Sequence, residues 1–457
     1  NDSPEEHFTD TIKAACGLAD PNAVWGMTQA APELVHWLLK LGVKFNMSGY
    51  DDVDLRNFGG QKKKRTAFAQ SDTGKQIMTA MIDAVRRKEA SGMVERFSHH
   101  SFLTLRLCGN ICCGCVIRDE YSQETVELPG DAVIVATGGM HGLFGNTTGS
   151  LSNTGEVTAE LFRLGVPLAN GEMIQYHPTT VKCGGKRMLI SEAARGEGGR
   201  LFAMKDGKQW YFMEEKYPEL GNLMPRDITA REIWKVSHES EVFLDMTEIS
   251  EEIISNKLSG LADDCMTYLH KDIRKEPVSV LPGIHYFMGG ILVDEQHRTP
   301  IQNLYAAGEC CAQYHGANRL GGNSLLGALY GGRVAAKSAC EQADVVDLSC
   351  ATQIDFPPAS QISEIKQLNK VMQETMGVVR NENTLLNGIQ TVQALTGNLP
   401  LLGMAVLKSA LARKESRGAH WREDYPKSND DDYLKTTVAR FDGKQIQISF
   451  VPVPERR

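Results

Sequence analysis

Asp131-Ala-Val-Ile-Val-Ala-Thr-Gly-Gly139 is a continuous apolar run that ends in a glycine turn. A strand of this kind is buried on both faces, which is typical of a parallel sheet whose carboxyl edge holds a ligand. Much later in the chain, Gln302-Asn-Leu-Tyr-Ala-Ala-Gly-Glu309 repeats the same arrangement. Two such strands separated by a long mixed segment predict an α/β protein in which one nucleotide-binding sheet is interrupted by an inserted domain.

Blocks of helical and strand-like periodicity lie on either side of these two runs. Apolar residues at helical spacing predict helices over 4–18 and 28–42, and Asp72-Thr-Gly74 predicts the capped start of a third helix that reaches about residue 88. The segments 94–118 and 124–130 predict the strands of a hairpin or meander. The remaining expectations are a mixed α+β region over 156–284, a helix over 325–343, a break around Asp355-Phe-Pro-Pro-Ala359 and helices between 360 and 415.

The composition excludes several classes of protein. A chain of 457 residues is long enough for about two to four domains with several buried cores. Its formal net charge of −8 gives no reason to expect nucleic acid or an acidic membrane surface as a direct partner. No run of roughly 18 apolar residues occurs, so we expect no membrane-spanning segment.

The cysteines predict a reducing compartment. They number eleven, an odd count without regular spacing, and Cys112, Cys113 and Cys115 crowd into one strand-like stretch where disulfide geometry would be poor. No second cluster with paired spacing accompanies them, so we expect no protein-bound metal.

The segment His315-Gly-Ala-Asn-Arg-Leu-Gly-Gly-Asn-Ser-Leu-Leu326 predicts a site for an anionic ligand beside a cofactor. It places the fixed cation Arg319 between a histidine and a glycine-rich turn that opens a helix near Ser324. Glycine lets the backbone approach a ligand closely, and a helix N-terminus directs unpaired N–H groups and a positive dipole end toward it. The alternative is an arginine on a solvated loop, but Asn318 and Asn323 add polar groups that such a loop does not need.

Four further clusters join histidines, arginines and hydroxyls to turn residues. If they converge, guanidinium forks and imidazoles suit a small dicarboxylate, because arginine binds carboxylates bidentately and histidine adds single hydrogen bonds. A lone histidine is more often a structural residue, so the prediction depends on that convergence. The clusters are Tyr176-His-Pro-Thr179, Ser191-Glu-Ala-Ala-Arg-Gly-Glu-Gly-Gly199, Pro225-Arg-Asp227 and His285-Tyr-Phe-Met-Gly-Gly290.

Taken in order, these motifs resemble the flavoprotein subunit of succinate dehydrogenase and fumarate reductase. The resemblance covers nearly the whole chain and rests on many collinear motifs rather than on one. They are Arg56-Asn-Phe-Gly-Gly-Gln61, Arg65-Thr66, Asp72-Thr-Gly74, His177-Pro-Thr179, Arg195-Gly-Glu-Gly-Gly199, Arg226-Asp227, His285-Tyr-Phe-Met-Gly-Gly290, Ala307-Gly-Glu309, the segment 315–325 and Arg417-Gly-Ala-His-Trp-Arg-Glu-Asp424.

The resemblance implies an FAD-dependent enzyme that interconverts fumarate and succinate by hydride transfer at flavin N5. His177, Ser191, His285 and Arg319 would hold the two substrate carboxylates, with Phe58 as one wall. Ser191 stands where the family pattern has Thr, which keeps the hydroxyl and loses a methyl. Arg226 would give the proton to the alkene, with reprotonation through Glu192 and Arg195.

The resemblance also implies flavin contacts and a domain order. The cofactor-binding residues would be Thr137, Gly138, Glu156, Glu309, Ser324 and Leu325, with Glu156 in place of the family's Asp. We expect a Rossmann-like FAD-binding domain over 1–160 and 285–346, interrupted by an α+β capping domain over 161–284. A helical domain with a C-terminal tail would follow over 347–457.

The beginning of the chain departs from the family pattern. Family members start with a strand and a G-x-G-x-x-G turn that seat the FAD pyrophosphate, whereas this chain starts at Asn1-Asp-Ser-Pro4 without a methionine or a targeting signal. We therefore expect that the N-terminal βαβ segment is missing.

Partners and alternatives follow from the same resemblance. We expect an iron-sulfur subunit, a cytoplasmic location and peripheral attachment to the membrane through an anchor subunit. The first alternative is an oxidase or reductase of a related acid, such as L-aspartate oxidase. It would need a charged residue near the substrate amino group, and the stretch Phe58-Gly-Gly-Gln61 is uncharged. The second is a non-catalytic scaffold, for which the arginine and histidine set would be needless.

Overall fold

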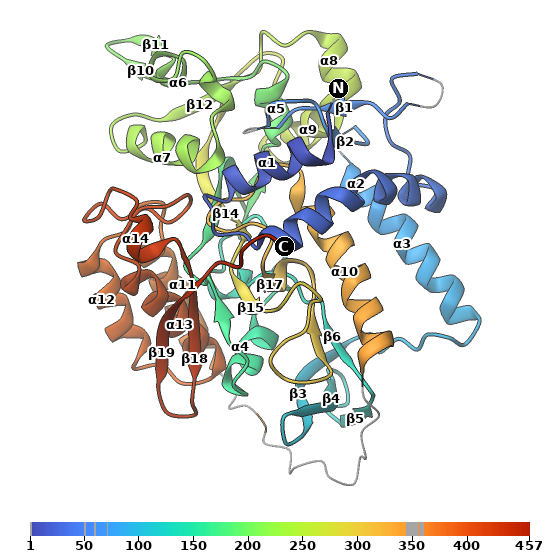
Figure 1. The fold of residues 1–457 in the computed structure, drawn as a ribbon. Helices are drawn as coiled ribbons and strands as arrows, with labels where there is room; N and C mark the ends of the chain where they lie inside the picture. The colour runs from blue at the N-terminus through green and yellow to red at the C-terminus, as the bar shows by residue number, and fades with distance from the viewer. Residues whose placement is uncertain (1, 50–51, 59–60, 71, 344–355, 357–360) are drawn as a thin grey trace.

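The structure is a computed structural model that describes residues 2–49, 52–58, 61–70, 72–343, 356 and 361–457 (Figure 1). Two parts of the predicted motifs lie outside these ranges. They are Gly59-Gly60 and, apart from Phe356, the break Asp355-Phe-Pro-Pro-Ala359.

The two apolar runs pair as predicted. β6 (Val133–Val135) lies parallel to β16 (Leu304–Ala306), with Ile134 opposite Tyr305. The expectation that β6 is buried on both faces is wrong, because Ile134 is 41% exposed. Among the described strands β6 pairs with β16 alone, so it is an edge strand.

The three expected N-terminal helices are present. α1 (Pro4–Ala14) and α2 (Pro21–Leu41) begin at Ser3 and Asp20, whose side chains accept hydrogen bonds from backbone N–H groups of the first turn. α3 spans Thr73–Ala90, but Asp72 at its N-cap makes no side-chain capping bond, so that detail of the prediction is wrong. α2 lies against both α3 and α10 (Asn323–Gln342) (Figure 1).

The predicted meander is confirmed. Its antiparallel strands are β3 (His100–Cys108), β4 (Ile111–Asp119) and β5 (Thr125–Pro129), in spatial order β3-β4-β5. β3 starts six residues later than position 94, immediately after His99, whose φ of 59° belongs to a turn. A two-stranded ladder of β1 (Leu55–Arg56) and β2 (Thr66–Ala67) precedes the meander.

Two sheets lie in the mixed region between β6 and β16, which also contributes β7 to a third sheet. β8 (Ile174–Cys183) lies between β14 (Leu281–Phe287) and β9 (Lys186–Leu189), and a four-stranded sheet follows the order β11-β10-β12-β13. The latter lies toward the top of Figure 1 over its own apolar core, which includes Leu201, Ile233 and Leu244. The other elements here are α4 (Glu156–Arg163), β7 (Leu168–Ala169), α5 (Glu192–Gly196), β10 (Arg200–Lys205), β11 (Lys208–Trp210), α6 (Phe212–Lys216), α7 (Arg226–Val236), β12 (Val242–Asp245), α8 (Glu251–Lys257), α9 (Ser259–Asp264) and β13 (Val278–Ser279).

The C-terminal part contains the expected helices and an unexpected hairpin. α11 (Ile362–Thr375), α12 (Glu382–Val392) and α13 (Asn398–Ala412) pack together at the left of Figure 1, and the short α14 (Asp430–Tyr433) follows. The tail then forms the antiparallel pair β18 (Lys435–Phe441) and β19 (Ile446–Pro452). β18 also pairs with β7, so the hairpin completes a five-stranded sheet with β15 (Gly290–Leu292) and β17 (Cys311–Ala312).

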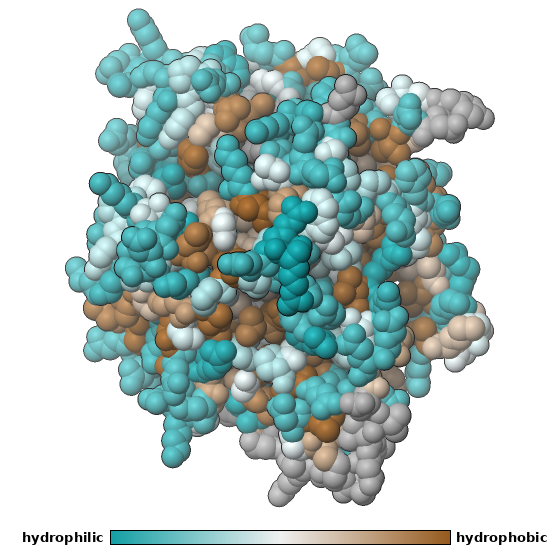
Figure 2. Space-filling model, in the orientation of Figure 1, coloured by the Kyte–Doolittle hydropathy of each residue, from teal (hydrophilic) through white to brown (hydrophobic). Residues whose placement is uncertain are grey.

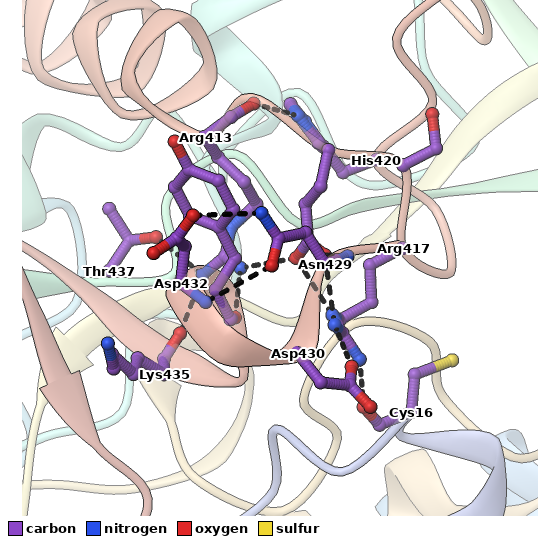
Figure 3. A network of polar contacts seen from close by, with 12 residues as sticks. Cys16, Arg413, Arg417, His420, Asn429, Asp430, Asp432, Lys435 and Thr437 are labelled. Atoms are coloured by element: carbon purple, nitrogen blue, oxygen red, sulfur yellow. Dashed lines mark hydrogen bonds and ion pairs between the residues drawn. The ribbon is translucent and has the colours of Figure 1, made fainter. Parts of the chain in front are cut away.

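A buried network of charges joins distant parts of the chain (Figure 3). Arg413 donates to Glu172 and Glu415 over 2.7 and 2.8 Å, and all three side chains are fully buried. Arg417 donates to both carboxylate oxygens of Glu415 and, over 3.2 Å, to the carbonyl of Cys16 after α1. The network thus ties the N-terminal helices and the segment before β8 to the C-terminal part.

The surface agrees with the absence of an apolar run. Figure 2 shows a face covered mostly by hydrophilic side chains, with hydrophobic residues in scattered groups. Within the described ranges, every helix is too short or too polar to cross a membrane.

Removing the central guanidinium should destabilise the fold strongly. Arg413→Met leaves the buried carboxylate of Glu172 without its cation and removes one of the two cations of Glu415, and we expect a loss of about 3–5 kcal/mol in the free energy of unfolding. The exposed pair of Arg333 and Glu33 offers the control, because Arg333→Met should change stability by less than about 0.5 kcal/mol. Urea unfolding followed by circular dichroism measures both, and equal midpoints would show that the network does not stabilise the fold.

Candidate active site

The glycine-rich turn before α10 shapes the site. Gly322 is the N-cap residue and has a φ of 86°, a conformation that favours glycine. A Cβ on Gly321 would lie 2.6 Å from the Cβ of Phe58, so only glycine allows this close approach. α10 begins at Asn323, one residue before the predicted start, and its first turn faces a cavity.

This cavity has a volume of about 280 Å³ and two chemically different walls. One wall is apolar and comes mainly from α2, α3 and α10, with Leu34, Leu38, Ile77 and Leu329 among its residues. The other is polar and contains four of the predicted residues, which are Arg226, His285, Arg319 and Ser324. Two further predicted residues, Phe58 and Leu325, add apolar surface to the cavity.

A chain of buried charges lies behind Arg226. Arg226, the first residue of α7, donates to Oε2 of Glu192 from Nε over 3.0 Å and from Nη2 over 2.6 Å. Arg195, one turn after Glu192 on α5, donates to Oε1 over 3.2 Å. Burial alone would raise the pKa of Glu192, but the two guanidinium groups lower it, so its carboxylate stays ionised. The structure therefore brings the three predicted proton-transfer residues together.

Arg319 is a buried cation of a different kind. In the part of the chain that the structure describes, no carboxylate pairs with its guanidinium, and its buried Nε has no hydrogen-bond partner. The group lies over the ring of Tyr286, 4.3 Å from the ring centroid. Burial, followed by repulsion from Arg226, lowers the pKa of Arg319 to about 9, which leaves it charged at neutral pH.

Gln175 connects the two arginines, and the sequence analysis missed it. Its Oε1 accepts from Arg226 Nη1 over 3.0 Å, while its Nε2 donates to the carbonyl of Arg319 over 2.9 Å and to Asn318 Oδ1 over 3.0 Å. Asn318 in turn donates to Asp227 over 3.0 Å. The signal that could have revealed Gln175 is its position two residues before His177, because alternate strand residues share a face.

The two predicted histidines face each other, and of the two His285 lines the cavity. The rings of His177 and His285 lie 5.2 Å apart in an edge-to-face arrangement. Nδ1 of His285 lies 2.8 Å from the hydroxyl of Thr148, and Nδ1 of His177 accepts from the backbone N–H of Thr179 over 3.3 Å, which puts the ring proton of a neutral His177 on Nε2. Burial first, and then the neighbouring positive groups, hold the pKa of both rings well below the ordinary value, so both are neutral. Each ring then has Nε2 for a ligand.

Ser191 lies at the start of α5 and serves as its N-cap. Its Oγ accepts a hydrogen bond from the N–H of Ala193 over 3.2 Å. The cap fixes the first turn of the helix, which carries Glu192. Because the hydroxyl accepts in this bond, its proton remains for a ligand.

The predicted flavin residues fall into two groups. Ser324 and Leu325 line the cavity, whereas Glu309 accepts from the backbone N–H of Phe287 over 3.0 Å and lies next to Gly139. Thr137 and Gly138 follow β6, as expected for a turn at a carboxyl edge. Glu156 is exposed at the start of α4 and does not line the cavity, so its role as a cofactor ligand stays a prediction.

The charges of this cluster do not balance. Arg195, Arg226 and Arg319 contribute three positive charges and Glu192 one negative charge, while the two histidines are neutral. All four charged side chains are buried. An excess of two buried positive charges is costly unless an anion neutralises it.

Fold and site together define an FAD-dependent oxidoreductase. The model of the FAD binding domain matches residues 1–325, and the fumarate reductase flavoprotein C-terminal model matches residues 395–456. The succinate dehydrogenase flavoprotein subunit of Bacillus subtilis is 36% identical, covering all of this chain and 88% of the relative. The chain therefore belongs to the family of succinate dehydrogenase and fumarate reductase flavoproteins.

Other relatives define how broad that family is. The L-aspartate oxidase of Nostoc sp. is 31% identical over 96% of this chain and 84% of its own length. Among solved structures, a variant of the Escherichia coli quinol fumarate reductase flavoprotein superposes with a TM-score of 0.89 at 26% identity, covering 99% of this chain and 87% of that one.

The cavity suits the flavin of FAD. A helix N-terminus at Asn323 meets one end of an apolar slot, and such an end stabilises negative charge on a bound ring. The glycine turn before it leaves no Cβ between the backbone and a planar ligand.

The buried histidines should make stability depend on pH. His177 has a folded-state pKa well below the ordinary histidine value of 6.5, mainly because it is buried, so the unfolded chain takes up a proton that the folded chain does not, and stability falls as pH drops below about 6.5. Between pH 7.5 and 5.5 we expect the wild type to lose about 1.4 kcal/mol more than His177→Asn.

Urea unfolding at both pH values measures this difference. The exposed His36, replaced by Asn in the same way, serves as the control. The assignment of a neutral His177 would be wrong if wild type and His177→Asn lost stability equally.

Proposed function

We propose that this enzyme interconverts fumarate and succinate. The observation that carries the proposal is the excess of two buried positive charges at a cavity lined by the neutral His285, whose ring contacts that of the neutral His177. A small dicarboxylate supplies the two missing negative charges. It also offers four oxygen atoms to guanidinium and imidazole donors.

The proposed substrate-binding residues divide between the two ends of the dicarboxylate. Arg319 has a free side for a bidentate carboxylate contact, since no described carboxylate occupies it. His177 and His285 offer Nε2, and Ser191 offers its hydroxyl proton, to the other oxygens. Phe58 packs against Gly321 and closes the side of the cavity, which excludes water from the double bond.

Arg226 is the proposed proton donor to the alkene carbon. An arginine gives up its proton reluctantly, so its neutral state must be brief. Glu192 touches Arg226 at one oxygen and Arg195 at the other, which supports a path for rapid reprotonation. Gln175 holds the remaining Nη1 of Arg226 and thereby directs the group toward the cavity.

FAD supplies the hydride in the reductive direction and accepts it in the oxidative one. We propose that Ser324 and Leu325 contact its ring from the start of α10, and that Thr137, Gly138, Glu156 and Glu309 bind the rest of it. One hydride and one proton then add across the double bond of fumarate and give succinate. Fixed positive groups at both carboxylates polarise the alkene for that addition.

The proposed domain order places this site between two parts. Residues 1–160 and 285–346 would be the FAD-binding domain and 161–284 the capping domain, with the helical domain over 347–457 carrying the β18–β19 hairpin. We also propose that the enzyme works as a subunit with an iron-sulfur partner, at the cytoplasmic side of a membrane anchor. The names of relatives as flavoprotein subunits support this.

Oxidation of L-aspartate is the second candidate, because relatives include L-aspartate oxidases. An amino group on the substrate would need an acidic or carbonyl partner at the cavity. Among the described residues that line it, none is Asp or Glu, whereas six are Arg or His. This favours the uncharged carbon backbone of fumarate over that of aspartate.

Replacing the proposed donor tests the reaction. With reduced viologen and fumarate, Arg226→Ala should lower turnover by about 10²- to 10⁴-fold while FAD stays bound, because general acid catalysis is lost. Arg231→Ala is the matched control on the same helix, since its guanidinium lies over Trp421 and away from the cavity.

Two outcomes would contradict the proposal. If Arg226→Ala kept more than about a tenth of the wild-type turnover, Arg226 would not be the donor. If the wild-type holoenzyme ignored fumarate but formed peroxide from oxygen and aspartate, the enzyme would be an oxidase instead.

A further inference from the structure

Arg319 is held by an aromatic ring instead of a carboxylate. Its guanidinium carbon lies 4.3 Å from the centroid of the Tyr286 ring, and no described carboxylate pairs with it. We propose that Tyr286 is a positioning residue that holds Arg319 through the face of its ring and leaves the whole positive charge to the substrate carboxylate. This inference rests on the proposed function.

A bulge in β14 allows Tyr286 to contact Arg319. The pairing of β14 with β8 shifts between Ile284 and Tyr286, so His285 is an extra residue in the ladder. Neighbouring residues of a regular strand point to opposite faces, whereas a bulge re-aims a side chain. His285 thus lines the cavity while Tyr286, the next residue, contacts Arg319, which lines the same cavity.

The ring of Tyr286 is itself fixed in place. Its side chain is buried, with 7% exposure, and the imidazole of His315 packs edge-to-face against it at 5.3 Å. His315 and Arg319 come from the same turn, four residues apart. One ring therefore contacts the turn at two points and sets the direction of the guanidinium.

An aromatic ring beside Arg319 and a carboxylate in the same place would affect ligand binding differently. A carboxylate would orient Arg319 equally well, but it would also neutralise the cation and compete with the substrate for its N–H donors. The negative face of an aromatic ring attracts the cation and takes none of these donors. Arg226 lacks this arrangement, because it bonds to Glu192 directly.

The experiment changes the electronic character of the ring and keeps its shape. Tyr286 is replaced in the FAD-loaded holoenzyme by phenylalanine, 4-fluorophenylalanine and 3,4,5-trifluorophenylalanine, which weaken the negative face stepwise. Calorimetric titration with malonate, a dicarboxylate that is not reduced, measures the dissociation constant. We expect Tyr286→Phe to bind about as tightly as wild type and the trifluoro variant about three- to tenfold more weakly.

The same analogues at Phe162, a buried ring far from these contacts in α4, provide the control and should leave malonate binding unchanged. The thermal midpoint should stay constant across the Tyr286 series, which separates positioning from a loss of folding. A dissociation constant that does not follow the degree of fluorination would overturn the inference and leave the proposed function standing. A wild-type holoenzyme that binds FAD but no dicarboxylate would overturn both.

Discussion

An excess of positive charge inside the protein is the constraint on which the site depends. Three guanidinium groups and one carboxylate lie buried together, and the low polarity around them makes each unbalanced charge expensive. The fold tolerates the excess because each cation has some partner: Arg195 and Arg226 share Glu192, and Arg319 rests on Tyr286. Two positive charges of this cluster remain without a negative counter-charge within it, and an anionic ligand would supply that charge.

Meeting that constraint requires segments that are distant in sequence to be held rigidly. The side chains come from β8, α5, α7, β14 and the turn before α10, and a shift of one of them would break the contacts of the others. Gln175 fixes β8 to both arginines, while the network around Arg413 ties the C-terminal part to the segment before β8. The C-terminal ion pairs thus support the site without touching it.

The sequence predicted the elements whose signal is local. The apolar runs of β6 and β16 and the helices follow from periodicity. The resemblance, not a local signal, implied that His177, Arg226, His285 and Arg319 converge. Features that depend on neighbours could not be predicted. The exposure of Ile134 depends on which strands lie beside β6, and the contact of Tyr286 depends on a bulge. The β18–β19 hairpin had a local signal, Asp442-Gly443 between alternating residues, but its pairing with β7 is nonlocal.

The neutrality of the histidines completes the electrostatic argument. If His177 and His285 were protonated, the cluster would carry four excess positive charges, and a dianion would be held far more tightly than turnover allows. Burial and the nearby guanidinium groups prevent that protonation, so the rings contribute directed hydrogen bonds without further charge. The same arginines that would attract the carboxylates of the proposed substrate therefore also keep the imidazoles neutral. One group of side chains therefore determines both how strongly the ligand is attracted and how readily it is released.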